Sequence, residues 1–145
     1  MRVTTKGIYG LSALIDLALY GKESLVSLSS IAERQNLSMS YLEQTFPLLK
    51  KAGIIKSMLG SSGGYQLAEP PENISIKMVL ETLDGSLSIV SEKNSDHSVL
   101  SKSMKKYIWD KVDASVSGIL DSITLLDITE NYKAESQKTE PMFYI

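Results

Sequence analysis

Apolar residues recur at helical spacing through the first fifty positions. Between Thr5 and Tyr20 they fall every three or four residues, which predicts an amphipathic helix that stops at Gly21. Ser27 is placed to cap a second helix, and Asn36 tolerates the left-handed conformation where that helix ends. A third helix follows, and its expected buried stripe is Leu42, Phe46 and Leu49. The chain therefore opens with three short helices.

Two serines compete to begin the third helix. Ser40-Tyr-Leu-Glu43 fits a capping box, so we expect Ser40 rather than Ser38 to be the N-cap. Pro47 has no amide to bond the carbonyl of Glu43. We therefore expect the helix to kink at Pro47 or to restart there as a new turn.

A β-hairpin is predicted next. Residues 54–58 and 65–67 are short strand-like runs on either side of a glycine-serine segment, residues 60–64. A fourth helix, capped by Ser75 and stopped by Gly85, completes a first region of residues 1–85. Three helices followed by a hairpin predict a winged helix-turn-helix. The expected fold class is mainly α with a small β-hairpin, plus a long helix described next.

The C-terminal half has a different pattern. Residues 86–98 are polar and predict a loop, and helical spacing returns from Val99 to Ser122. This long helix has more apolar surface than the N-terminal region can cover, so we expect it to pair with a second copy of the chain. The expected dimerisation residues are Leu100, Met104, Ile108, Val112, Val116 and Ile119.

The chain is expected to end in a polar tail. Thr124 starts a short turn through Ile128, which closes a dimerisation region of residues 99–130. Residues 131–140 read as a polar linker within a tail of residues 131–145. The last four residues, Met142, Phe143, Tyr144 and Ile145, are apolar and are candidates for binding a partner.

The absence of cysteine among the 145 residues excludes several kinds of chemistry. Disulfides, thiolate zinc sites, cysteine-ligated iron–sulfur clusters and cysteine nucleophiles all require that side chain. With 43% hydrophobic residues, the composition is that of a globular domain. No apolar run approaches the ~20 residues of a membrane span, and the N-terminus has no small-residue cleavage site. We expect a cytoplasmic protein with no membrane contact.

Charge is distributed unevenly along the chain. The net charge is −2, but residues 1–66 carry seven Lys/Arg against four Asp/Glu, whereas residues 67–145 are acidic. The basic half is also the half with the predicted helix pair, so double-stranded DNA is a reasonable partner despite the acidic total.

The start of the third helix has residues suited to the DNA major groove. Ser38, Ser40 and Gln44 can reach bases or backbone, and Tyr41 can contact a phosphate, next to the positive end of the helix dipole. At the wing tip, Ser61, Ser62 and the amide of Gly63 can approach phosphates or the minor groove. The alternative is that the serines are only caps and that Gln44 is only a solvated residue.

Catalysis and metal binding are not expected. The chain has one histidine, no Gly-x-Ser-x-Gly elbow and no Gly-Lys-Ser/Thr after the glycines, and Glu81 with Asp84 is a helix-surface pair. Glu92, Asp96 and His97 could ligate a metal, but a single histidine in a polar loop is usually solvated. We expect no catalytic residue, no metal and no cofactor.

Three segments, "MRVTTKGIYGLSALIDLALYG", "SLSSIAERQNLSMSYLEQTFPLLKKAGIIKS" and "GSSGGYQLAEPPENISIKMVLETLDG", resemble the winged-helix regulators that include IscR, NsrR and CymR. The resemblance continues through "YIWDKVDASVSGILDSITLLDI". It implies a homodimer that presents two recognition helices and two wings to a pseudo-palindromic operator. It also implies DNA contacts from Arg2, Lys6 and Lys51, and a capping or specificity role for Glu43.

Two positions depart from this family pattern. Leu59 and Ile8 stand where many members have an arginine, so we expect weaker contacts from the wing. Cluster-binding members place three cysteines in the region of residues 86–98, and this chain has none. The resemblance is strongest to the cluster-free CymR branch, which also ends in "MFYI".

That branch is linked to O-acetylserine sulfhydrylase, the cysteine synthase. The resemblance therefore implies a repressor of cysteine and sulfur metabolism genes whose tail docks in this enzyme. A tail that latches onto its own dimer is equally compatible with the sequence. Two further alternatives stay open, a repressor that senses a small molecule directly and a winged helix that serves only protein interaction.

Overall fold

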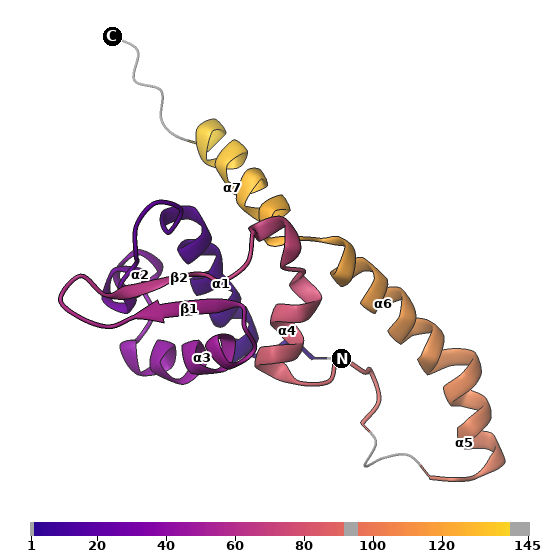
Figure 1. The fold of residues 1–145 in the computed structure, drawn as a ribbon. Helices are drawn as coiled ribbons and strands as arrows, with labels where there is room; N and C mark the ends of the chain where they lie inside the picture. The colour runs from indigo at the N-terminus through magenta and orange to yellow at the C-terminus, as the bar shows by residue number, and fades with distance from the viewer. Residues whose placement is uncertain (1, 92–95, 140–145) are drawn as a thin grey trace.

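Helix α1 (Thr5–Tyr20) runs through the N-terminal part of the chain, and five of the later elements pack against it (Figure 1). The predicted amphipathic helix is present, with Ala13, Leu14 and Leu17 fully buried, whereas Ile8 is 51% exposed. Gly21 ends the helix with φ −102°, outside the left-handed region. The computed structural model describes residues 2–91 and 96–139.

Helices α2 (Leu28–Gln35) and α3 (Met39–Lys51) form the predicted helix pair. The side chain of Ser27 caps α2, and Asn36 takes the left-handed conformation, φ 54° and ψ 49°, at its end. The core side of the pair buries Ile31, Leu42, Phe46 and Leu49.

The N-cap of α3 is Ser38, so the prediction of Ser40 was wrong. The hydroxyl of Ser38 accepts a hydrogen bond from the amide of Tyr41 at 3.1 Å. The start at Ser38 places Leu37 just before the cap and Leu42 at the fourth helical position; Leu42 is in the apolar core, and the partly buried Leu37 packs against that core. This is a hydrophobic staple. A start at Ser40 would put Gln44 in the place of Leu42.

Helix α3 is continuous through Pro47, so it does not restart there as a new turn. Pro47 and Glu43 are both exposed. The Glu43 carbonyl that loses its intrahelical donor therefore lies on the solvent side, where water can satisfy it.

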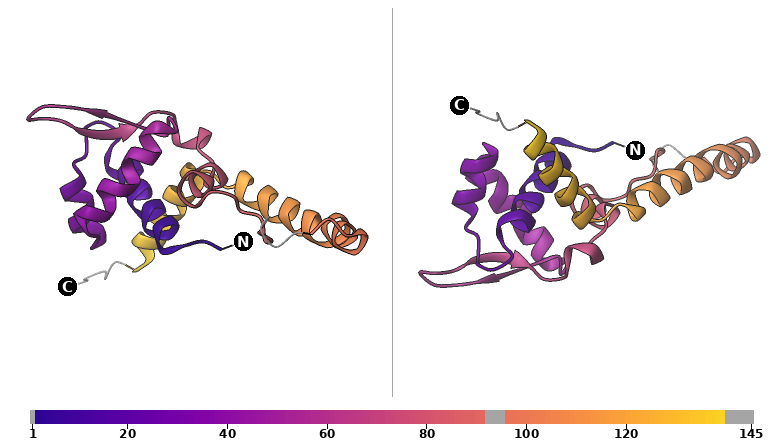
Figure 2. Two further views of the ribbon diagram at one scale, coloured as in Figure 1. Left: turned by 90° about the horizontal axis from the view of Figure 1, so that it is seen from below. Right: turned by 90° about the horizontal axis from the view of Figure 1, so that it is seen from above.

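The predicted hairpin is present. Strands β1 (Ile55–Met58) and β2 (Gly64–Leu67) pair antiparallel, with Ile55 opposite Leu67. Val26 adds an isolated bridge to Tyr65, in which the two backbone amides donate to each other's carbonyls with N···O distances of 2.9 and 2.8 Å. The hairpin tip extends beyond the helices as a wing (Figure 2).

A 3₁₀ turn, η1 (Pro71–Asn73), leads into α4 (Ile76–Asp84). Ser75 caps α4 through the amide of Met78, and Gly85 ends it with φ 79°, both as predicted. We call α1–α4 with the hairpin the head. It is mainly helical with one two-stranded sheet, which confirms the predicted winged-helix fold class.

A long helical rod projects from the head (Figure 1). It consists of α5 (Val99–Met104), a π-helical turn η3 (Lys105–Trp109) and α6 (Asp110–Ser122). Helical dihedral angles run through both junctions, so the predicted long helix is one rod. None of its described residues is buried within the monomer.

Helix α7 (Leu125–Thr139) is longer than the short turn that we expected, and the linker prediction for residues 131–139 was wrong. Thr124 and Asp127 form a reciprocal capping box, in which each backbone amide donates to the side chain of the other residue, with N···O distances of 2.9 and 3.2 Å. Leu125 is fully buried, and its amide bonds the carbonyl of Ile74 at 2.8 Å. The first turn of α7 is therefore part of the core of the head.

The predicted loop between α4 and the rod is attached to α6. The carboxylate of Asp113 accepts from the Ser88 hydroxyl and from the Ile89 amide, each at 2.8 Å. These bonds, chiefly the one from Ile89, lower the pKa of Asp113. The candidates Glu92 and Met142–Ile145 lie outside the described residues. Among the described residues, none of the helices combines the length and the apolar composition that a membrane span requires.

Candidate nucleic-acid interface

A polar groove separates the start of α1 from the start of α3. It has a volume of about 460 Å³ and is formed by both helices and the turn that leads into α3. Its lining residues are Thr5, Tyr9, Ser12, Gln35, Asn36, Leu37, Ser38 and Tyr41. The structure therefore brings Ser38 and Tyr41 together with α1, and the groove exposes polar groups beside the amino end of α3.

The outward face of α3 begins with exposed polar residues. Ser40 and Gln44 are exposed, and Ser38 is exposed although its hydroxyl already accepts from the helix. Amides of a first helical turn carry a partial positive charge and favour anions. This face is suited to a phosphate backbone and, through Gln44, to a base edge.

Tyr41 lies differently from our prediction of a phosphate contact. Its ring packs edge-on against Tyr9, with centroids 5.8 Å apart and an interplanar angle of 74°. Its hydroxyl oxygen is buried and has no hydrogen-bond partner among the described residues. Burial chiefly, with added repulsion from Asp84, raises the pKa of Tyr41. The hydroxyl is therefore not presented to a phosphate in this structure.

Tyr41→Phe is expected to raise the free energy of unfolding by about 1 kcal/mol at neutral pH, because a buried unpaired hydroxyl carries a desolvation penalty. The raised pKa of Tyr41 means that the wild-type protein loses stability as pH rises above 10, where the unfolded state ionises first. The variant should lack this loss of stability at high pH. The difference in free energy of unfolding between the variant and the wild-type protein should therefore widen above pH 10. Urea unfolding at pH 7 and pH 10.5 measures both effects, and lower stability of the variant at pH 7 would contradict the prediction.

A buried carboxylate that sequence reasoning missed fixes α2 against α1. Asp16 is fully buried and accepts two hydrogen bonds from the Arg34 guanidinium, at 2.9 and 2.7 Å, and one from the Gln35 amide at 2.8 Å. The Asp16 hydrogen bond raises the pKa of Arg34. The same guanidinium lies 4.1 Å from the ring centroid of Tyr20. Arg34 is therefore committed to holding the helix pair in place.

The wing forms a second, separate groove. It has a volume of about 420 Å³, and Ser62 and Gly63 line it together with Ser27, Ser30 and Arg34. A Cβ at Gly63 would collide with the carbonyl of Met58, so glycine is required for the tip to close. Ser61 and Ser62 are exposed, and Leu59 is 99% exposed at the same tip.

The basic candidates are spread over the head. Arg2 precedes α1 and is exposed, whereas Lys6 is half-buried in its first turn. Lys51 is exposed but is the last residue of α3, at the opposite end from Ser38. Lys51 therefore lies roughly 18 Å along the helix axis from the start of α3, and it would meet a different part of a duplex.

The rod carries the candidate dimerisation residues on an accessible face. Leu100 is 69% exposed, Ile108 43% and Ile119 60%. Met104 is exposed, and Val112 and Val116 are half-buried. Apolar side chains at this level of exposure along one helix are unusual for a monomer.

Ligands for iron are poorly represented in this chain. The sequence supplies no thiolate, and no three His, Asp or Glu side chains in the described part converge on a possible ion site. Asp96 instead accepts from the amide and hydroxyl of Ser98, at 3.0 and 2.6 Å, which lowers the pKa of Asp96. The side chains of the described residues therefore do not supply a set of ligands that fits an iron–sulfur cluster.

Comparison with known proteins identifies relatives across nearly the whole chain. The family model of Rrf2, described as an iron-dependent transcriptional regulator, matches residues 3–131. The HTH-type transcriptional regulator CymR of Bacillus subtilis is 37% identical over 145 residues, which is 100% of both chains. IscR of Photobacterium profundum is 37% identical over 126 residues, 86% of this chain and 73% of its own.

Solved structures show the same fold. The structure of CymR, the global cysteine regulator of B. subtilis, has a TM-score of 0.77 at 36% identity and covers 90% of this chain and 98% of its own. The structure of T. potens IscR has a TM-score of 0.73 at 42% identity. The match covers 99% of this chain and 95% of the IscR chain.

Proposed function

This chain belongs to the Rrf2 family of transcriptional regulators, and on that basis we propose that it is a repressor that binds a pseudo-palindromic operator as a homodimer. The observation that carries the proposal is the exposed polar face at the amino end of α3. Ser40 and Gln44 lie there beside the groove shared with α1. A major groove admits such a helix, and its free amides favour phosphate.

The rod supports the dimer. Burying six large apolar side chains contributes about 1.5 to 3 kcal/mol each when the burial is complete. A two-fold axis across the rods would present two α3 helices to two half-sites, which matches the symmetry of a palindromic operator.

We infer that the regulated genes serve cysteine and sulfur metabolism and that O-acetylserine sulfhydrylase is a co-regulator. Two observations support this inference. CymR of B. subtilis, which matches this chain end to end, is described as a global cysteine regulator. The sequence also contains the apolar segment Met142-Phe143-Tyr144-Ile145 after a polar stretch, and a short apolar segment suits capture in an enzyme cleft.

Deletion of Met142–Ile145 is expected to abolish binding to the synthase, which calorimetry measures directly. The deletion should leave the affinity of the free dimer for DNA unchanged. A matched control replaces these residues with Ser-Gly-Ser-Gly, so that the chain length is kept. Unchanged affinity for the synthase would end the docking proposal and favour a tail that latches onto its own dimer.

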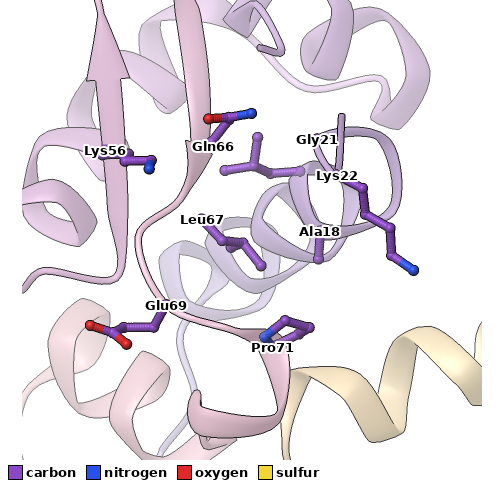
Figure 3. A pocket seen from close by; sticks show the side chains of 9 residues that line it. Ala18, Gly21, Lys22, Lys56, Gln66, Leu67, Glu69 and Pro71 are labelled. Carbon is purple, nitrogen blue, oxygen red and sulfur yellow. The ribbon is translucent and has the colours of Figure 1, made fainter. Parts of the chain in front are cut away.

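Direct sensing of a small molecule is a second candidate, favoured by a groove between the end of α1, strand β2 and η1 (Figure 3). Its volume is about 300 Å³, at the small end of the range for ligand sites. Leu17, Ala18 and Leu67 supply apolar lining, and Lys22, Lys56 and Glu69 supply charge. Thermal-shift screening of sulfur metabolites, with and without the synthase, would distinguish this candidate from a tail-dependent mechanism.

Genomic footprinting of the purified protein, with and without the synthase, tests the proposed function. We expect protected palindromic sites upstream of sulfur-assimilation genes, and stronger protection with the enzyme present. Sites unrelated to sulfur metabolism would overturn the assignment of target genes. A lack of binding even to random duplex at low salt would favour a protein-interaction module instead.

A further inference from the structure

The N-terminal arm, residues 2–4 before α1, is joined to the last residue of α4. The amide of Thr4 donates to Oδ2 of Asp84 at 3.1 Å, and the Thr4 hydroxyl donates to Oδ1 of the same carboxylate. Within the described chain, Thr4 is the arm residue that bonds to another element. One carboxylate therefore holds the arm through two hydrogen bonds.

The same threonine also fixes the start of α1. Its hydroxyl oxygen accepts from the amide of Gly7 at 3.2 Å while its proton goes to Asp84. A Cβ at residue 7 would collide with the Asp84 carboxylate, so glycine allows α4 and α1 to approach this closely. A carboxylate at the amino end of α1 is also favoured by the helix dipole.

Arg2 and Lys6 flank this attachment on the side of the chain that the proposed function directs to DNA. Arg2 is exposed in the arm, and Lys6 follows in the first turn of α1. A free arm would lose backbone conformational entropy at each of its residues on binding. An arm already held at Thr4 has lost part of that freedom before DNA arrives.

We propose that Asp84 is a positioning residue for DNA binding, which holds the arm so that Arg2 and Lys6 reach phosphates. The proposal rests on the proposed function and specifies how one part of its interface is built. In Figures 1 and 2 the arm lies beside the segment that follows α4. That segment is bonded to α6 through Asp113, so Asp84 lies where the head meets the connection to the rod.

The test measures how the affinity for DNA depends on salt, because each phosphate contact contributes about 0.9 to the slope of log K against log salt. The probe is a duplex that the wild-type protein selects from a random library. Asp84→Ala is expected to lower the slope by about two and the affinity at 150 mM salt by roughly tenfold or more. Glu81→Ala, one turn earlier on α4 and also a carboxylate, should change neither.

Threonine variants keep the test informative if Asp84→Ala fails to fold. Thr4→Val removes the hydroxyl bond to Asp84 but keeps the bond from the backbone amide, so it should lower the slope, though by less than Asp84→Ala does. Thr4→Ser restores the hydroxyl and should restore the slope. Loss of an N-cap alone would lower the melting temperature and leave the slope unchanged, so the slope separates positioning from stability.

A double-variant comparison completes the test. In a chain that already carries Arg2→Ala and Lys6→Ala, Asp84→Ala should produce no further loss of affinity. An unchanged slope in folded Asp84→Ala, or fully additive losses, would overturn the proposal. If the wild-type protein selects no duplex at all, the proposed function fails, and that outcome is distinct from a failure of Asp84 alone.

Discussion

Ile108→Asp is expected to convert the dimer into monomers and to lower operator affinity by roughly a hundredfold or more. Ile108 lies in the middle of the rod and is 43% exposed in the single chain, although it is a large apolar residue. A carboxylate on that face would have to be buried without a partner in the dimer. The two half-sites would then bind separate molecules, and the gain from effective concentration would be lost.

Sedimentation equilibrium at micromolar concentration measures the dimer, and a gel shift measures operator affinity. Ala114→Asp is the matched control, since helical spacing places residue 114 on the other side of the rod from the candidate dimerisation residues, and it is exposed there. The control should remain dimeric and bind DNA normally. An Ile108→Asp protein that stays dimeric would show that the rod is not the interface.

Arg34→Ala is expected to lower the free energy of unfolding by about 3 kcal/mol. The substitution leaves the Asp16 carboxylate fully buried with Gln35 as its remaining partner, and an uncompensated buried charge is costly. The Arg34 side chain is 32% exposed, so water can partly replace it, which places the estimate at the lower end of the range for buried pairs.

Urea unfolding measures the effect, and a double-variant cycle assigns it. Asp16→Ala in the Arg34→Ala background should cost less than Asp16→Ala alone, because the ion pair is already lost and the second substitution removes the buried carboxylate that lacks its partner. Lys77→Ala is a suitable control, since its ion pair with Glu81 is partly exposed at 3.7 Å and contributes little. A loss below 1 kcal/mol for Arg34→Ala would contradict the role given to Asp16.

Local signals in the sequence were sufficient for most of the head. Ser27, Asn36, Ser75 and Gly85 each take the capping role that their residue type predicted. The N-cap role of Ser38 was missed because Ser38 and Ser40 both satisfied local capping rules. The hydrophobic staple of Leu37 and Leu42 distinguishes them, and it was available in the sequence.

The other misses depend on partners that are far apart in the chain. The contacts of Asp16 with Arg34, and of Thr4 with Asp84, join residues 18 and 80 positions apart, and no periodicity reports them. The burial of the Tyr41 hydroxyl follows from how α3 packs beside Tyr9. The second half of α7 has no apolar stripe, so its helix depends on residue propensity and on local pairs such as Lys138 with Glu135.

The most direct measurement of the central claim compares Gln44→Ala with Gln137→Ala on a selected duplex and on random duplex. Both glutamines are exposed on helices, but Gln44 lies on the polar face of α3 that we propose faces DNA, and Gln137 lies on α7. Gln44→Ala should weaken specific binding by roughly tenfold or more while non-specific binding stays unchanged, because a bidentate base contact is lost. Gln137→Ala should bind both duplexes as the wild-type protein does. Equal specific affinity for the two variants would contradict the insertion of α3 into the groove.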